Sequence, residues 1–178
     1  METLKKPDVA TNEASGLSNN TESNYNRPEL KLIHDALIKV IGDKQPLIDS
    51  GIYEFAYHSR WLGYLYGGKP KLMMVFRVVT IGPAFGKKLY RCFNLKGLNK
   101  KRGDFSVGRR GDFYYEYVKL FGIEPDDSRI SMTPFKNVII KASVRIVDTD
   151  YKQRLLPESM RYSVIKELLT VEAGDPNL

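Results

Sequence analysis

The sequence contains a single cysteine, Cys92, among its 178 residues. One thiol cannot form an internal disulfide, and it has no second thiolate with which to hold a zinc ion. The sequence therefore predicts a protein of a reducing compartment. We expect Cys92 to be a small buried strand residue rather than a catalytic nucleophile.

Histidine is almost as scarce, since His34 and His58 are the two in the sequence. Their spacing does not match the His-Glu-x-x-His pattern of a zinc site. We expect His34 on the surface of a short helix. His58 is a candidate for stacking or for phosphate contact, although an ordinary strand position is the simpler interpretation.

Carboxylates do not cluster as a nuclease requires. Residues 51–123 contain four acids, and the group Glu124-Pro125-Asp126-Asp127 lacks the following acid-x-Lys of a nuclease core. Gly103 and Gly108 have the spacing of a phosphate-binding loop, but Arg109 and Arg110 follow them instead of Lys-Ser/Thr. The sequence therefore predicts no metal, no cofactor and no enzyme activity.

Long apolar runs are also missing. The longest, such as Leu72–Phe76 and Val138–Ile140, fall far short of the roughly 20 residues that cross a bilayer. The residues from Met1 to Pro7 lack the apolar region of a secretory signal. We expect a cytoplasmic protein with no membrane partner.

Aromatic and basic residues, in contrast, are concentrated in one segment. Residues 51–123 hold sixteen of the twenty aromatic residues and fourteen Lys and Arg, which gives this segment a net charge of +10. Residues 1–50 carry −2 and residues 124–178 carry −1. Cations follow phosphates and flat rings accept nucleobases, so the combination favours a nucleic-acid partner. A solvated basic face over an aromatic core is the alternative.

The N-terminal part differs in character from the rest. Residues 1–26 are rich in Asn, Ser, Thr and Glu, which predicts a disordered tail. Residues 27–50 are expected to form a helix and a linker. The helix runs from Pro28 to Ile41, with apolar residues recurring on one face, and Gly42 ends it.

From Gly51 the hydrophobic period changes to two, which is typical of strands. Short turns at Gly67–Pro70 and Gly82–Gly86 join the first three predicted strands as an antiparallel meander. A polar hairpin at Asp148–Arg154 joins the last two. The five predicted strands are Gly51–His58, Lys71–Ile81, Lys87–Leu95, Asn137–Val147 and Tyr162–Val171.

A basic loop and a helix separate the third strand from the fourth. Lys96–Gly111 is too rich in charge and glycine for a core element. Asp112 is expected to be the N-cap of a helix that runs to Phe121 and is closed by Gly122. Its rings recur at i, i+4 and i+8, which favours a core position over stacking with a ligand.

This order of elements predicts a mainly β fold. Three strands, one inserted helix and two further strands form the sequence of elements of a five-stranded Greek-key barrel of the OB-fold type. We expect this domain to span residues 51–172, with a short C-terminal tail at residues 173–178. OB folds commonly bind oligonucleotides.

Three motifs resemble a group of known proteins. They are Gly51-x-Tyr53, Phe76-Arg77-Val78-Val79-x-x-Gly82-Pro83-x-x-Gly86-Lys87-x-Leu89 and Phe93-Asn94-Leu95. The chain from Gly51 to Val171 resembles small proteins of bacteriophages and conjugative elements, several of which are thought to be single-stranded-DNA-binding-like OB folds. The resemblance implies this fold, and a DNA-binding role near replication or recombination genes.

An OB fold presents its ligand on the second and third strands and the adjoining loops. The first of these loops would carry the richest mixture of rings and cations, and Trp61 is the first choice for a base platform. The candidate nucleic-acid-binding residues are Arg60, Trp61, Tyr64, Tyr66, Lys69 and Lys71 in that loop, Arg77, Lys88, Tyr90 and Arg91 on the strands, and Lys100, Lys101, Arg102, Arg109 and Arg110 in the basic loop.

Structural alternatives stay open for these candidates. In the alternative interpretation, Trp61 and Tyr64 close the end of the barrel, and the charges of the basic loop are solvated without binding a ligand. Arg77 and Arg91 are alternatively expected to pair with Glu116 or Glu54. The alternation of apolar residues from 72 to 81 does not decide which face of the second strand points outward.

The leading hypothesis is a non-catalytic, sequence-tolerant single-stranded DNA-binding protein of a mobile genetic element, acting in replication, recombination or transfer. Its expected partner is single-stranded DNA, with RNA left open, together with a protein of the replication or recombination machinery. A homodimer is left open as well. The alternative hypothesis is an OB-fold interaction module, an accessory or host-inhibitory factor that docks on a protein through a basic face.

Overall fold

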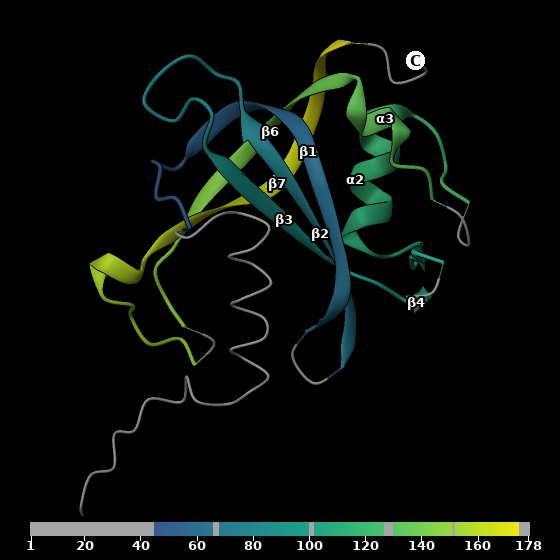
Figure 1. Ribbon diagram of the computed structural model, residues 1–178, viewed down its shortest axis with the longest axis horizontal. Coiled ribbons are helices and arrows are strands. Elements are labelled where there is room, and N and C mark those ends of the chain that lie inside the picture. Colours follow the sequence, from purple (N-terminus) through teal and green to yellow (C-terminus); the bar gives the residue numbers. More distant parts are fainter. Residues whose placement is uncertain (1–44, 66–67, 100–101, 127–129, 151, 175–178) are drawn as a thin grey trace, which may run out of the picture.

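A computed structural model of the chain describes residues 45–65, 68–99, 102–126, 130–150 and 152–174 (Figure 1). The predicted disordered tail (1–26) and the predicted helix from Pro28 to Ile41 lie outside the described residues. Most of the predicted C-terminal tail, residues 175–178, lies outside them too.

The described part of the chain is mainly β, as predicted. Its centre is a five-stranded antiparallel sheet with the strand order β3-β2-β1-β6-β7. Each predicted strand corresponds to one strand of this sheet, although the boundaries differ. The strands are β1 (Gly51–Leu65), β2 (Lys69–Val78), β3 (Lys88–Asn94), β6 (Val138–Val147) and β7 (Tyr162–Gly174).

Strand β1 is twice as long as predicted. Residues Gly51–Ala56 pair with β6, and Phe55–Leu65 pair with β2, with a shift of register between Tyr57 and Ser59 as at a β-bulge. The predicted first loop is therefore wrong, because most of it is a hairpin of two long strands. Apolar cross-strand pairs such as Leu62 with Leu72 stabilise this extension.

Strand β2 ends three residues earlier than predicted, at Val78. The backbone N–H of Val79 still donates to the carbonyl of Glu54 at 2.8 Å, but the chain then turns, and Ile81 is 94% exposed. Gly82 has φ 144°, a conformation that L side chains rarely adopt. The prediction that Ile81 belongs to the second strand is therefore wrong.

The two faces of β2 are distinct. The even-numbered residues from Leu72 to Val78 belong to the hydrophobic core cluster, together with Phe55 of β1 and Leu89 of β3. The odd-numbered residues point to the opposite face, and Arg77 there is exposed. We call this opposite side of β1, β2 and β3 the outer face. The structure thus decides the orientation that the sequence left open.

Helix α2 has the predicted bounds, Asp112–Phe121. Gly122 ends it in the left-handed conformation (φ 66°) and donates its N–H to the carbonyl of Val118. The predicted N-cap is wrong, because Asp112 is already the first helical residue and Gly111 precedes it without a side-chain cap. Phe113 and Tyr117 are buried, as expected for a core face.

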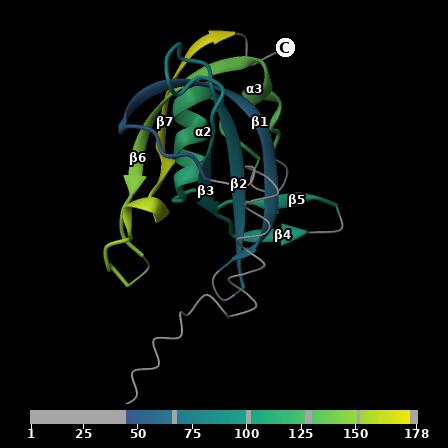
Figure 2. The same ribbon diagram turned by 60° about the vertical axis from the view of Figure 1, so that its left-hand side comes forward.

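The predicted basic loop is not a loop throughout. It contains a small hairpin of β4 (Gly97–Asn99) and β5 (Asp104–Ser106), which projects away from the main sheet (Figure 2). Two apolar residues explain this local order. Phe105 and Val107 are 3% and 2% exposed, and the Phe105 ring lies 5.8 Å from that of Phe113. The high charge of this segment predicted a loop, although Phe105 and Val107 anchor it to the core.

Two short helices and an N-terminal segment complete the domain. Helix α3 (Thr133–Lys136) lies between α2 and β6 in the chain, and a 3₁₀ helix, η2 (Glu158–Met160), follows the predicted polar hairpin and precedes β7. Ile48 is buried in the core, and its N–H donates to Ser163 Oγ at 2.9 Å. The packed unit thus includes residues ahead of Gly51.

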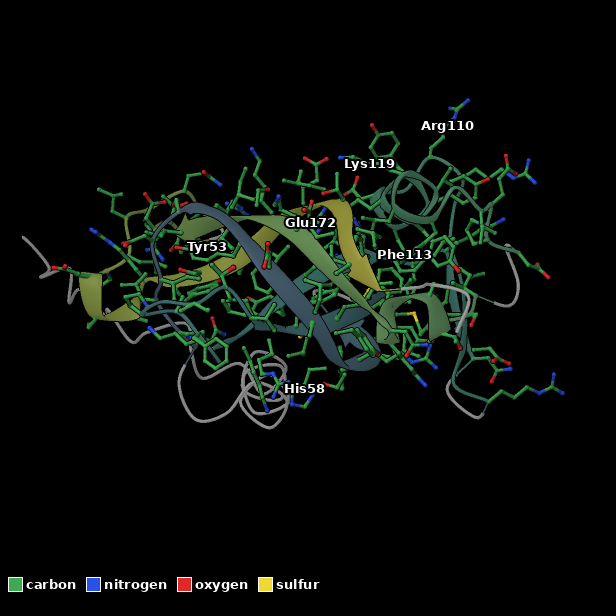
Figure 3. The ribbon with its side chains drawn as sticks, turned by 90° about the horizontal axis from the view of Figure 1, so that it is seen from above. Tyr53, His58, Arg110, Phe113, Lys119 and Glu172 are labelled. Atoms are coloured by element: carbon green, nitrogen blue, oxygen red, sulfur yellow. The ribbon has the colours of Figure 1, made fainter. Side chains whose placement is uncertain are left out.

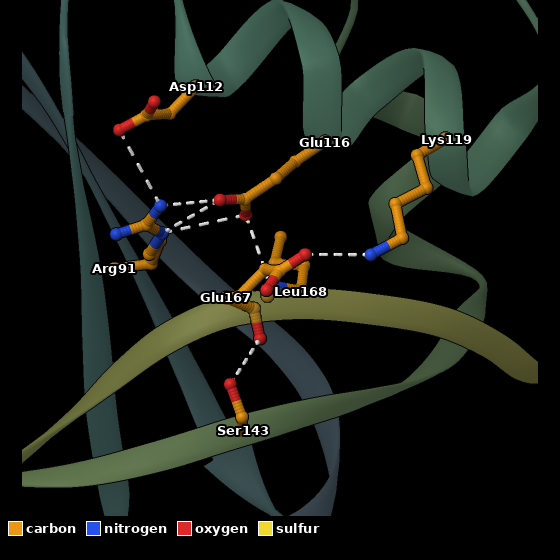
Figure 4. Close-up of polar contacts among 7 residues, drawn as sticks. All are labelled: Arg91, Asp112, Glu116, Lys119, Ser143, Glu167 and Leu168. Carbon is orange, nitrogen blue, oxygen red and sulfur yellow. Dashed lines mark hydrogen bonds and ion pairs between the residues drawn. The ribbon is translucent and has the colours of Figure 1, made fainter.

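The edge strands β3 and β7 approach each other on the side that α2 covers, with Cα atoms within 8 Å. Within the described residues they share no hydrogen-bonded ladder, so the predicted barrel closure is not confirmed. The Glu116 side chain of α2 lies in this gap instead (Figure 4). The sheet is strongly curved and open, with a helix across its opening.

Candidate nucleic-acid interface

Six of the predicted binding residues lie on the outer face. Cross-strand pairing places Trp61 of β1 beside Met73 of β2, and Met73 beside Cys92 of β3, and it places Val75 beside Tyr90. The rows on either side of these two carry cations, Lys71 in one and Arg77 with Lys88 in the other. The six residues are Trp61, Lys69, Lys71, Arg77, Lys88 and Tyr90.

The indole of Trp61 lies along β1, over Gly63. A Cβ atom added at Gly63 would come within 2.0 Å of Trp61 Cη2, so only glycine leaves room for the ring in this position. Because residues two apart in a strand share a face, the two positions are neighbours on the outer face. The ring is half-buried. Its partial exposure leaves surface for stacking.

The middle of the outer face is apolar. Met73 and Val75 are 2% and 0% exposed although they lie outside the core cluster. Cys92 shares this strip, and burial raises the pKa of its thiol above the usual range, with the charges of Lys71 and Arg91 acting in the opposite direction. A thiol with a raised pKa is a poor nucleophile at neutral pH, and Cys92 is a strand residue as expected, but it is half-buried and not fully buried.

The cations of the outer face differ in how far their charge is already engaged by other side chains. Lys71 donates a hydrogen bond from its ammonium group to the Asn94 side-chain oxygen across the sheet. Arg77 is exposed, and no carboxylate of the described residues pairs with it. The alternative pairing of Arg77 with Glu54 is therefore not observed in the described part of the chain.

Arg91 does not belong to the outer face. It points to the core side of β3, where its guanidinium pairs with the buried carboxylate of Glu116 and lies 3.8 Å from Asp112 (Figure 4). Glu116 also accepts the backbone N–H of Leu168 at 3.1 Å. Burial raises the pKa of Glu116, and the bonds to Arg91 oppose this shift. The structural alternative considered for Arg91 is thus observed.

Arg60 and Tyr64 also point away from the outer face. The Arg60 guanidinium lies 5.6 Å from the centre of the Phe105 ring, a cation–π arrangement, and Nη2 is 3.5 Å from the Gly103 carbonyl oxygen. The Tyr64 hydroxyl donates to the Leu98 carbonyl at 3.4 Å. Both side chains therefore connect β1 to the β4–β5 hairpin.

The remaining candidates do not extend the outer face. Arg110 lies near the start of α2, on the opposite side of the molecule from His58 (Figure 3). Arg102 and Arg109 are exposed. Tyr66, Lys100 and Lys101 lie outside the described residues. The fold thus separates a basic segment that is continuous in sequence into different surfaces.

A groove of about 440 Å³ lies beside the β-bulge of β1, and sequence analysis did not identify it as a site. Its walls are residues 57–60 of β1 and the segment around α3. Lys136 is separated from Arg60 by 76 positions, so no local motif could indicate their proximity. The described residues that line it are Tyr57, His58, Ser59, Arg60, Ile130, Met132, Thr133 and Lys136.

A second, smaller hollow of about 210 Å³ lies between α2 and β7. Four of its five described charged lining residues, all except Lys166, already belong to ion pairs. Lys119 Nζ lies 2.7 Å from Glu167 beside this hollow, and hydrogen bonding to Lys119 lowers the pKa of Glu167. Together with the Arg91–Glu116 pair, these contacts hold the helix against the sheet edges.

Among the described residues, no group of three or more His, Cys, Asp and Glu side chains is placed to hold a metal ion. No helix in the same part of the chain is long and apolar enough to span a membrane. No family model, curated protein or solved structure matches the chain.

Proposed function

We propose that the chain is a non-catalytic protein that binds single-stranded nucleic acid, DNA in the first place, on the outer face of β1, β2 and β3. One observation carries the proposal: six residues chosen for stacking and phosphate contact fall on one side of three adjacent strands. Bases would stack on Trp61 and Tyr90, and phosphates would contact Lys71, Arg77 and Lys88.

The strand order supports an OB-type architecture as part of this proposal. Strand β1 pairs with both β2 and β6, and the edges β3 and β7 approach each other with a helix across the gap. Pairing of β3 with β7 would complete a five-stranded barrel. In such a barrel the outer side of the second and third strands is a common oligonucleotide surface, which coincides with the outer face.

The resemblance to proteins of bacteriophages and conjugative elements supplies the biological setting of the proposal. In that setting the protein would protect or present single strands during replication, recombination or transfer of a mobile element. Stacking and phosphate contacts are tolerant of sequence, because every base has a π face and every nucleotide has a phosphate. We therefore propose binding with little sequence preference.

A salt-titrated binding assay tests the proposal. Three phosphate contacts predict a log–log slope of affinity against salt near −2, at about −0.7 per contact. Single-stranded oligonucleotides of different sequences should bind with similar affinity, and more tightly than duplex of the same length. Absence of binding at low salt would contradict the proposal and favour the alternative, a module that docks on an acidic protein surface.

A further inference from the structure

The groove beside the β-bulge of β1 gathers positive charge without carboxylates. Arg60 and His58 line it from β1, Lys136 lines it from the end of α3, and all three side chains are exposed. The hydroxyl groups of Ser59 and Thr133 add hydrogen-bond donors. None of the described lining residues is Asp or Glu.

Neither cation is neutralised by a neighbouring acid. Within the described part of the chain, no carboxylate lies within 4.0 Å of Arg60 or Lys136. Arg60 is oriented by the Phe105 ring and by the Gly103 carbonyl, which leaves its charge uncompensated. Burial raises the pKa of the Tyr57 hydroxyl, and the positive charge of Arg60 opposes this rise.

The walls of the groove are held in place by the core. The ring of Tyr57 lies 6.3 Å from that of Phe135 and 5.9 Å from that of Phe76. Phe135 is 1% exposed and directly precedes Lys136, so the lysine backbone is anchored while its side chain is free to reach a ligand. The anchored backbone reduces the cost of ordering the site around an anion, although the Lys136 side chain is itself ordered only on binding.

The groove adjoins the outer face through Ser59. This residue lines the groove, and it also pairs with Val75 in the row that ends at Tyr90 on β3. Two strand spacings, about 10 Å, separate β3 from β1. The groove therefore adjoins the outer face at the β1 end of this row, although Val75 within the row is itself fully buried.

We propose that this groove is a phosphate-binding site formed by Arg60, Lys136 and His58, and that it anchors one phosphate of the nucleic acid bound on the outer face. The second half of this statement rests on the function proposed above. The first half does not, because two cations and an imidazole without a carboxylate suit a phosphate group whether it belongs to a nucleic acid or to inorganic phosphate.

Titration with inorganic phosphate at fixed pH and ionic strength tests the site directly. The sequence has two histidines, so the imidazole NMR signals of His58 are identified by comparison with His58→Gln. We expect a saturable shift of the His58 signals. Lys136→Gln should weaken phosphate binding by about fivefold or more, since a charge-assisted bond is lost. Lys141→Gln, which removes one lysine charge from β6 outside the groove, should leave it unchanged.

A second arm uses a single-stranded oligonucleotide. Lys136→Gln should reduce the salt slope by about 0.7, the share of one phosphate contact, and Arg60→Gln should do the same. If phosphate shifts His58 but the oligonucleotide does not bind the wild-type protein, the phosphate site is supported and the proposed function fails. If the oligonucleotide binds, yet phosphate leaves His58 unchanged and both variants keep the full slope, the groove proposal is overturned and the proposed function stands.

Discussion

The carboxylate of Glu116 on α2 accepts a hydrogen bond from the backbone N–H of Leu168 on β7, at 3.1 Å. The same carboxylate pairs with Arg91 on β3 (Figure 4). One buried side chain therefore joins the two edge strands of the sheet, where a continuous ladder would otherwise be expected.

Replacing Glu116 by Ala should strongly destabilise the domain. The substitution leaves the Arg91 charge and the Leu168 N–H without their partner in a largely buried setting, which typically costs about 3–5 kcal/mol. Chemical denaturation measures the loss. The double variant Arg91→Met, Glu116→Leu should recover most of it, because no unpaired charge remains. A cost below about 1 kcal/mol for Glu116→Ala would contradict this account.

The Trp61–Gly63 contact gives a second prediction. Trp61→Ala should reduce single-strand affinity by about 1–3 kcal/mol with little change of salt slope, because stacking is lost and phosphate contacts are kept. Gly63→Ala should displace the ring, since the new Cβ would overlap it. Trp61 is the only tryptophan, so its fluorescence reports this displacement directly.

Thermal melting is the control for these variants. A folded Trp61→Ala protein with unchanged affinity would show that the indole does not stack with bases. If instead the substitution unfolds the domain, Gly63→Ala serves as the milder test of the same ring position.

The charges of the outer face give a third prediction. The double variant Arg77→Gln, Lys88→Gln should flatten the salt slope by about 1.4, because two phosphate contacts are lost. The matched variant Arg109→Gln, Arg110→Gln removes the same charge near the start of α2 and should leave the slope nearly unchanged. Equal effects of the two pairs would mean that binding is not confined to the outer face.

Cys92 provides a chemical test on the unmodified protein. Because burial raises the pKa of its thiol, reaction with a thiol reagent such as DTNB should be slow at pH 7 and should accelerate as the pH rises above about 8.5. Cys92 lies on the outer face beside Met73, and it is the only cysteine, so the rate is unambiguous.

A single-stranded oligonucleotide at saturating concentration should slow this reaction further at every pH. A duplex of equal length at the same concentration is the control. An unchanged rate with a bound oligonucleotide would place the nucleic acid away from β3.

Much of the fold could be predicted from the sequence, because the strand pattern and helix α2 depend on local periodicity. Phe113 and Tyr117 show this well, since their i, i+4 spacing alone indicated a buried face. The length of β1 could not be predicted, because the pairing of Trp61 with Met73 depends on a partner strand.

The candidate site was predicted only in part, because the rest of it depends on tertiary packing. Strand parity separates Tyr90 from Arg91, and placing either residue requires knowledge of which face α2 covers. Arg91 therefore pairs with Glu116, and it does not join the binding surface. Lys136 and Arg60 line the same groove because Phe135 packs on Tyr57, and this packing leaves no pattern in the sequence.

The side-chain closure between β3 and β7 has a consequence for motion. In a fully laddered barrel, opening requires several backbone hydrogen bonds to break together, whereas here the seam is held by the Glu116 carboxylate, the Lys119–Glu167 pair and helix packing. The amide of Leu168 should therefore exchange its hydrogen faster than amides in the β1–β2 ladder. We expect breathing at this seam to adjust the curvature of the sheet, and with it the spacing of side chains on the outer face, while every strand pair stays intact.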